Sequence, residues 1–373
     1  MKSLAVIAGC FCILVVLADG FNTIVVARRT QHVFRLARVF YSVTWTLCTT
    51  IAKRIHSGRM RESFLAIYGP LSVLTLLAIW ELGLTAGFGL IQWGVGIRAG
   101  GRVLQLGDVW YVSATTLLTL DTGHPENVAS RVISAFEGGI GLAFLALMIT
   151  YLPVLYQAYS NRDRRIALLD ARAGSPPSAA ELLLFDSGDL QRLERHLADW
   201  EQWSAELLET NLSFPMLAFF RSQHMNQSWL SAITTILDAA AVACICGEES
   251  VRTQAELTLA MGRHALVDIA AGFDAKPPTR RSERLSTRDF HAVRDLLRTA
   301  GAHWSLDKLT QVELNRAREL YEPYAEALST FLLIALPQWI AGEGKRENWR
   351  RASNRLKPDR FAVSDPYKLP EER

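Results

Sequence analysis

Half of the chain's 373 residues are hydrophobic (50%), 21% are charged, and the formal net charge is +3. Such a length is enough for about two domains of roughly 100–200 residues each, and so small a net charge gives no argument for nucleic acid as a partner. Hydrophobic residues are concentrated before Tyr159 and charged residues after it. This separation predicts a membrane half followed by a water-soluble half.

The five cysteines form neither a disulfide framework nor the four-ligand spacing of a zinc site. Cys244 and Cys246 stand one residue apart inside an apolar run, where burial in a helix is favoured over redox or metal chemistry. We therefore expect no metal site and no cofactor. The cysteines favour a reducing compartment only weakly.

Three apolar segments are long enough to cross the roughly 30 Å core of a bilayer, which takes about 20 helical residues. Each contains one acid, and the segments with their acids are Leu4–Val26 (Asp19), Ala66–Trp93 (Glu81) and Val132–Gln157 (Glu137). No small-residue cleavage site precedes Asp19, so we interpret the first segment as a retained span rather than a signal peptide. A fourth stretch, Val33–Ala52, contains Arg35 and Arg38. It is predicted to be an amphipathic helix in the membrane interface, with a fourth span as the alternative.

Basic residues predict the orientation of these segments. The loop between the first and second spans contains many arginines and lysines and one acid, Glu62. Arg162, Arg164 and Arg165 follow the third span directly. Both clusters are expected to be cytoplasmic, which places the N-terminus outside and the C-terminal half inside a multi-pass protein of the cell (inner) membrane.

The connection from Gly94 to Arg131 is therefore expected outside, and it opens with a glycine-rich turn. An apolar and aromatic stretch from Asp108 to Thr119 follows. Asp108 is a reasonable N-cap, and about eleven helical residues rise about 16 Å, roughly half the membrane core. A helix that enters this far and returns by an extended segment is a re-entrant loop, which needs protein or water around its backbone.

This region resembles the pore region of the potassium-channel superfamily. Trp110 and Tyr111 match the aromatic pair of the pore helix, and the run Thr115-Thr116-Leu-Leu-Thr119 matches its threonines. Thr119, Leu120, Asp121, Thr122 and Gly123 take the position of the selectivity filter. In the third span, Gly138, Gly139 and Gly141 are similar to the gating hinge of inner helices.

The resemblance covers about residues 66–158, and the wider layout is similar to that of bacterial proteins labelled potassium-channel-like. It implies a potassium channel that conducts passively, with a monovalent cation, K⁺, as the permeant ion and no cofactor. One pore loop cannot surround an axis, so the resemblance also implies a homotetramer. A filter of backbone carbonyls requires unusual backbone conformations, which glycine adopts without steric cost.

The filter departs from the family pattern at Asp121, Thr122 and His124. Aspartate tolerates positive φ better than most residues, so the bend can persist while potassium selectivity stays open. In a tetramer, the Asp121 carboxylates either form a ring that faces the pore or are tied back against the pore helix.

Acids inside a membrane are costly and therefore mark candidate functional sites. Asp19 can pair with Arg28 and Arg29 or be an interfacial acid near the end of its helix. For Glu81 and Glu137 structural pairing is favoured over ion binding, and Glu137 could support the filter from behind. Gly83 and Gly87 form a small-residue face that fits helix packing.

The C-terminal half shows helical periodicity throughout and no catalytic motif, so an enzyme is not expected. Apolar residues recur at three- and four-residue steps on one amphipathic helix: Leu190, Leu193, Leu197, Trp200, Trp203 and Leu207. Ala327–Ile340 is too short to span and is predicted to be a buried helix. In the polar stretch after Phe214, residues such as Arg221 and His224 either line a ligand pocket or satisfy a turn between two helices.

The sequence thus predicts an all-α membrane protein with four parts. They are an N-terminal span with a basic amphipathic helix (1–65), an ion-channel pore domain (66–158), a helical cytoplasmic domain (159–340) and a disordered charged tail (341–373). The leading interpretation is a homotetrameric cation channel whose cytoplasmic domain drives assembly or gating. The alternative is a non-conducting, membrane-anchored sensor or scaffold that retains the pore fold.

Overall fold

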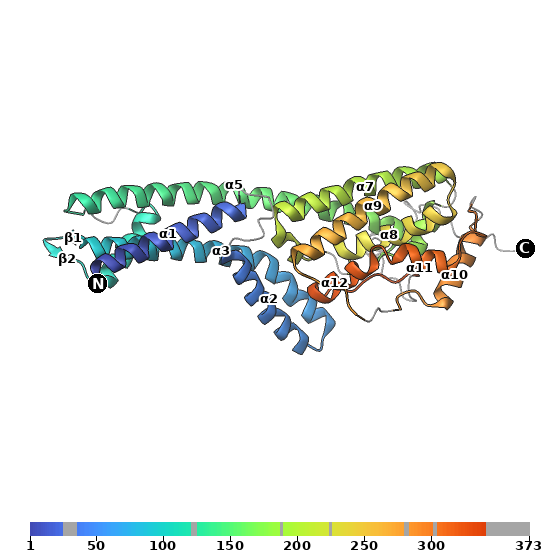
Figure 1. Cartoon of the computed structure of the whole chain (residues 1–373), viewed down its shortest axis with the longest axis horizontal. Helices are drawn as coiled ribbons and strands as arrows, with labels where there is room; N and C mark the ends of the chain where they lie inside the picture. Colours follow the sequence, from blue (N-terminus) through green and yellow to red (C-terminus); the bar gives the residue numbers. More distant parts are fainter. Residues whose placement is uncertain are drawn as a thin grey trace, which may run out of the picture. The chain divides into compact units, whose positions relative to one another are not determined.

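The computed structural model describes residues 1–24, 36–120, 125–186, 189–223, 226–279, 283–300 and 304–340. Over these residues the chain is all-helical, as predicted, with α-helices α1 to α12, one short 3₁₀ helix and one small β-hairpin (Figure 1). The chain divides into two compact units. Unit 1 is Met1–Asn161 with Glu209–Arg221, and unit 2 is Arg162–Leu208 with Ser222–Arg373.

Five helices begin in unit 1: α1 (Lys2–Ile24), α2 (Leu36–Arg54), α3 (Gly58–Val95), α4 (Leu106–Leu117) and α5 (Val128–Ala173). Among them α1, α3 and α5 are long and apolar enough to cross a membrane. They correspond to the three predicted spans, of which Val25 and Val26 lie outside the described residues. Two of these helices extend beyond the predicted spans. The 38 residues of α3 and the 46 residues of α5 rise about 57 and 69 Å. Each is therefore longer than a bilayer core of roughly 30 Å requires.

Glycines allow α1 and α3 to pack closely along each other (Figure 1). A Cβ atom on Gly87 would lie 2.6 Å from Cγ1 of Ile13, and one on Gly83 would lie 2.8 Å from Cγ2 of Val16. On the opposite helix, a Cβ atom on Gly9 would lie 2.5 Å from the Gly87 carbonyl oxygen. The prediction that Gly83 and Gly87 serve helix packing is confirmed.

Helix α2 has one buried and one exposed face. It buries Ala37, Trp45, Cys48 and Ala52, whereas Val39, Val43, Leu47 and Ile51 are exposed at four-residue steps. The residues from Val33 to Arg35 lie outside the described part of the chain. The residues named on both faces are apolar, so burial alone does not test the predicted amphipathic character, and a helix in the interface remains a prediction.

An aromatic segment from the second half of the sequence belongs to the core of unit 1. The 3₁₀ helix η1 (Pro215–Phe219) places the Phe219 ring 4.8 Å from the Trp45 ring and 5.5 Å from the Tyr68 ring, between centroids. Phe220 lies against Gly69, where a Cβ atom would be 2.8 Å from its ring. The predicted boundary near Tyr159 therefore misses this return of the chain, because the burial of these rings depends on contacts with residues far away in the sequence.

Unit 2 contains α6 (Ala179–Asp186), most of α7 (Leu190–Ser213), α8 (Trp229–Cys246), α9 (Glu249–Gly272), α10 (Thr287–Thr299), α11 (Gln311–Arg318) and α12 (Glu322–Leu332). The predicted stripe of α7 is confirmed for Leu193, Leu197, Trp200, Trp203 and Leu207, which are buried, whereas Leu190 at the start of the helix is partly exposed. Helix α8 also has the length and composition of a membrane span. It is nonetheless buried on all sides from Trp229 to Ala243, in contact with α6, α9, α11 and α12, which makes it the central helix of this core.

The predicted helix Ala327–Ile340 is wrong at both ends. Helix α12 begins at Glu322 and ends at Leu332, and Leu333 adopts a left-handed conformation with φ 54°. Pro337 lacks a backbone N–H and disfavours a helical continuation. The remaining segment packs against α6 and α8 instead, where the Trp339 carbonyl accepts from the Ala180 N–H at 3.1 Å and the Ala335 carbonyl accepts from the Ser231 hydroxyl at 2.9 Å.

A buried network of charges connects this segment to α8. The Arg284 guanidinium donates to both oxygens of Asp238, at 2.7 and 2.5 Å, and to Glu322 at 2.7 Å. The Tyr321 hydroxyl donates to Asp238 at 2.5 Å. The Arg284 guanidinium also lies 5.7 Å from the centre of the Trp339 ring. Sequence periodicity gave no sign of this network, because its members come from separate elements.

Candidate functional site

The glycine-rich turn forms the entrance to the predicted pore loop. Helix α3 ends at Gly96 in a left-handed conformation (φ 77°), whose N–H donates to the Gln92 and Trp93 carbonyls. Strands β1 (Arg98–Ala99) and β2 (Arg102–Val103) then pair as a hairpin. Gly100 and Gly101 connect them with φ 58° and 75°, values that favour glycine. The chain thus reverses direction directly after α3.

Helix α4 follows this reversal and corresponds to the predicted pore helix. Its 12 residues rise about 18 Å, little more than half a membrane core. The predicted N-cap is wrong, since Gln105 takes that position and Asp108 lies in the first turn. There the Asp108 carboxylate is still close to the partially positive helix end.

Both aromatic side chains of the pair on α4 are exposed, although α4 itself packs on α3. A Cβ atom on Gly89 of α3 would lie 3.5 Å from Cδ1 of Trp110 and 3.8 Å from Cβ of Ser113, so α4 rests on α3 at this glycine. Trp110 is 44% exposed and Tyr111 is 65% exposed. Two large aromatic side chains on one short helix therefore remain available for lipid or for another copy of the chain.

The C-terminal end of α4 is closed by hydrogen bonds of its own backbone. The Leu120 N–H donates to the Thr115 carbonyl at 2.8 Å, and the Thr119 N–H donates to the Thr116 carbonyl at 3.0 Å. This is the pattern of a Schellman cap, with Thr119 at the left-handed position (φ 59°). A β-branched residue is unusual there and costs of the order of 1–3 kcal/mol. The strain lies at the first residue of the predicted filter.

Helix α5 touches the same end of α4 through one of the three predicted hinge glycines. A Cβ atom on Gly141 would lie 1.8 Å from the Leu117 carbonyl oxygen, whereas one on Gly138 would lie 3.7 Å from the Thr116 carbonyl oxygen. A Cβ atom on Gly139 would meet no atom within 4 Å. Helix α5 is continuous through all three residues. Gly141 is thus a packing contact, and a hinge at these glycines remains a prediction.

The acid of α5 lies behind α4 in a buried polar cluster. Glu137 is hydrogen-bonded to the Ser113 hydroxyl of α4, which also lies 3.0 Å from the Thr85 carbonyl oxygen of α3. Close by, the Gln92 amide donates to the Ser134 hydroxyl at 3.0 Å and to the Ser130 carbonyl at 3.4 Å. Glu137 thus has a polar side-chain partner on α4, and its structural role in place of ion binding remains a prediction. Sequence reasoning did not identify its partners Ser113, Thr85 and Gln92.

The acid of α1 joins three helices. The Asp19 carboxylate accepts from the Trp80 indole N–H of α3 at 2.9 Å. It also accepts from the Ala37 N–H of the first turn of α2 at 3.1 Å. A carboxylate at a helix N-terminus is favoured by the exposed N–H groups and the helix dipole. The predicted partners Arg28 and Arg29 lie outside the described residues.

Glu81 differs from the other two acids. It is half-buried on α3, and none of the described side chains forms a hydrogen bond or an ion pair with it. Its predicted structural pairing therefore has no support in the described part of the chain.

The exit of the loop is anchored to the hairpin. Asp121, Thr122, Gly123 and His124 lie outside the described residues, so only Thr119 and Leu120 of the predicted filter are placed. After the gap, the Glu126 N–H donates to the Arg98 carbonyl at 2.9 Å, and the Glu126 carboxylate accepts from the Gly101 N–H at 2.7 Å. Both ends of the loop are thus fixed, one by the cap of α4 and the other by the hairpin.

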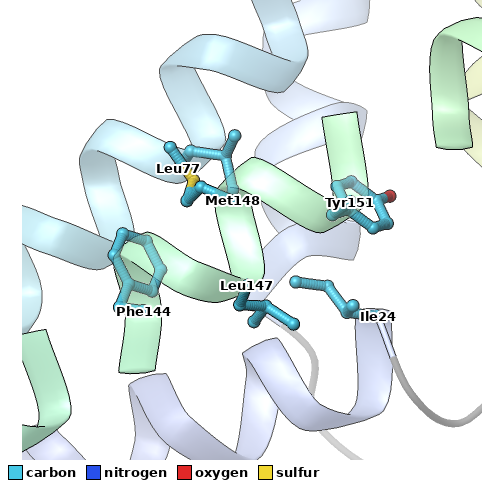
Figure 2. A pocket seen from close by; sticks show the side chains of 6 residues that line it. All are labelled: Ile24, Leu77, Phe144, Leu147, Met148 and Tyr151. Atoms are coloured by element: carbon cyan, nitrogen blue, oxygen red, sulfur yellow. The ribbon is translucent and has the colours of Figure 1, made fainter. Parts of the chain in front are cut away.

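A small apolar pocket lies farther along the three long helices. Its lining residues are Ile24, Leu77, Phe144, Leu147, Met148 and Tyr151 (Figure 2). The Tyr151 hydroxyl is the one polar group among these side chains, and the space between them does not accommodate a water-sized molecule. We interpret this pocket as imperfect packing of α1, α3 and α5 rather than as a ligand site.

The described residues therefore bring together a short helix, its strained end, a glycine contact on α5 and a buried acid. They contain no group of three or more histidine, cysteine or acidic residues that could hold a metal ion. Helix lengths and apolar composition support a membrane protein. Comparison of the chain with protein-family models, curated proteins and solved structures finds no match.

Proposed function

We propose that the chain is one subunit of a homotetrameric cation channel that conducts passively through the loop Thr119–Gly123. The observation that carries this proposal is α4, a helix of half-membrane length that lies between two apolar helices and ends in a left-handed residue. Backbone of this kind needs protein or water around it at membrane depth. Four copies of the loop around one axis would surround this backbone with protein on one side and with a water-filled path on the other.

The end of α4 favours a cation over an anion. Helix C-termini carry about half a negative charge, and filters replace an ion's hydration shell with backbone carbonyls. Thr119, the first residue of the predicted filter, has a left-handed backbone conformation. This agrees with the unusual backbone conformations that a filter requires. Asp121 adds a carboxylate from each copy. We therefore propose a monovalent cation as the permeant ion, with K⁺ as the first candidate. The selectivity for K⁺ over Na⁺ should be weaker than with a glycine at this position.

The exposed surface of unit 1 is consistent with assembly in a membrane. Large apolar side chains of α5 are exposed in the single chain, among them Phe136, Leu142, Leu145 and Ile149. Contiguous apolar surface of this kind marks a protein or lipid interface. A closed ring of identical subunits would bury part of this surface and surround one axis.

Ion flux into vesicles tests conduction and selectivity together. We expect the purified full-length protein to let both K⁺ and Na⁺ into lipid vesicles. Asp121→Gly should raise the ratio of K⁺ to Na⁺ flux severalfold, because it removes a carboxylate and restores the freedom to adopt positive φ. Asp307→Gly is the matched control, since Asp307 is exposed in a turn of unit 2, and it should leave the ratio unchanged. An unchanged ratio in Asp121→Gly would contradict the role of Asp121 in the filter.

The Schellman cap favours one alternative, a membrane-anchored sensor or scaffold that retains the pore fold without conducting. The cap engages the Thr115 and Thr116 carbonyls in internal hydrogen bonds, which leaves fewer oxygens at the end of α4 for an ion. A protein that assembles as a tetramer but passes no cation in the flux assay would support this alternative. In either case unit 2 would be the cytoplasmic assembly or gating module of an inner-membrane protein.

A further inference from the structure

The Ser113 hydroxyl lies close to two oxygen atoms, one of Glu137 and one of Thr85, but has a single hydrogen to donate. Ser113 and Glu137 are both fully buried. The Ser113 hydroxyl lies within hydrogen-bonding distance of the Glu137 carboxyl group and, at 3.0 Å, of the Thr85 carbonyl oxygen. A serine hydroxyl has one hydrogen to donate, and a carbonyl or a carboxylate has none. Two hydrogen bonds thus share the Ser113 oxygen, which supplies a hydrogen for one of them, so the other needs a hydrogen from a second group.

Gln92 also interacts with Glu137. Both N–H groups of its amide, however, already donate to other acceptors, the Ser134 hydroxyl and the Ser130 carbonyl. The second carboxyl oxygen of Glu137, Oε2, is buried with no hydrogen-bond donor among the described residues. None of the described basic side chains forms an ion pair with Glu137. An ionised carboxylate here would be fully buried, with Ser113 as its close donor and with Oε2 accepting no hydrogen bond from the described residues. Such an arrangement costs several kcal/mol in apolar surroundings.

We propose that Glu137 is a proton-carrying latch of α4: it holds a proton on Oε1 and donates it to the Ser113 hydroxyl, which in turn donates to the Thr85 carbonyl. One chain of two hydrogen bonds then runs from α5 through α4 to α3. Every hydrogen in it has an acceptor, and no charge is buried. Glu137 is in this sense a positioning residue for the pore helix of the proposed site, and the inference does not require that the site conducts.

Asp19, a second buried and hydrogen-bonded acid of unit 1, shows why the argument is specific to Glu137. Both oxygens of Asp19 lie near the Ala37 N–H, and one also accepts from the Trp80 indole N–H. Each of these partners is a donor, so the Asp19 bonds need no proton on the carboxyl group. Two buried acids in the same unit therefore have opposite hydrogen-bonding requirements.

Infrared spectroscopy of the full-length protein in vesicles at neutral pH tests the latch. A protonated carboxyl group gives a C=O stretching band well separated from the bands of carboxylates. We expect Glu137→Gln to remove intensity from this band, and Glu81→Gln to leave the Glu137 contribution in place. Ser113→Ala should shift the band without removing it, because the proton stays on Glu137 while its acceptor is lost.

Thermal unfolding of the same variants gives a second measurement. In Glu137→Gln, an amide N–H replaces the carboxyl O–H as donor to Ser113, so the unfolding midpoint should stay close to that of the unsubstituted protein. Glu137→Ala should lower it by several degrees, since it removes the donor and leaves a cavity. A band that is the same with and without Glu137, or a midpoint lowered equally by glutamine and alanine, would overturn the proposal. Neither readout depends on ion conduction, so a failed latch and a failed channel remain distinguishable.

Discussion

Gly141→Ala is expected to destabilise unit 1 and to abolish any cation flux. The added Cβ atom would lie 1.8 Å from the Leu117 carbonyl oxygen, 2.7 Å from its carbon and 3.0 Å from its Cα. These are backbone atoms at the end of α4, so no side-chain rotation relieves the overlap. Helix α4 must move away from α5, and overpacking of this kind costs about 1–3 kcal/mol or more. The unfolding midpoint and the vesicle flux measure the two effects.

The neighbouring glycines provide matched controls for this substitution. Gly139→Ala adds a methyl group where no atom lies within 4 Å, and Gly138→Ala makes an ordinary contact at 3.7 Å from the Thr116 carbonyl oxygen. Alanine is also the better helix former by up to about 1 kcal/mol. Both variants should therefore unfold at or above the midpoint of the unsubstituted protein. If Gly141→Ala behaves as they do, the described contact between α4 and α5 does not exist in the folded protein.

Asp238→Ala is expected to destabilise unit 2 by about 3–5 kcal/mol, as the removal of one partner from a buried ion pair typically does. The buried Arg284 guanidinium would keep Glu322 as its acidic partner, which it shares with Arg318. Arg284 would lose both of its hydrogen bonds to the Asp238 carboxylate, and the Tyr321 hydroxyl would lose its acceptor. The side chains of Arg284 and Asp238 are only 8% and 1% exposed, so water does not replace these bonds. Denaturant unfolding of the full-length protein, followed by tryptophan fluorescence, measures this loss.

An exposed ion pair of the same unit is the control for Asp238→Ala. Arg298 and Asp295 form a 2.7 Å contact in α10 with side chains 60% and 67% exposed. Exposed pairs contribute less than about 1 kcal/mol, so Asp295→Ala should change the unfolding free energy by less than that. A similar effect of the two substitutions would show that the network around Asp238 is open to water.

The membrane half could be predicted in outline because its signals are local in the sequence. Apolar length located α1, α3 and α5, and a short apolar stretch after a glycine-rich turn located α4. The full lengths of α3 and α5 could not be predicted from hydropathy, because both helices continue as polar helix beyond their apolar segments. Asp108 illustrates a related limit: N-cap preference favours aspartate, yet the helix begins two residues earlier.

Long-range packing could not be predicted from one sequence. The segment around Phe219 looks like a turn between two helices until Trp45 and Tyr68 are placed beside it. The partners of Asp19 could not be predicted, because the Ala37 N–H and the Trp80 indole N–H lie close to it only in the folded chain. Trp339 was assigned to a helix by its apolar neighbours, although the segment is held by hydrogen bonds to α6 and α8. In each case the deciding contact joins residues that no local pattern connects.

Recording current through Leu120→Cys in a planar bilayer tests the central claim most directly. Leu120 follows the cap of α4 and is 57% exposed, so its side chain should border the ion path at the deep end of the loop, where the filter begins. We predict a cation current that a positively charged thiol reagent reduces in up to four steps. The unsubstituted protein should keep its current under the same reagent. Absence of any current in the assembled protein, or a current through Leu120→Cys that the reagent leaves unchanged, would contradict a pore at this loop.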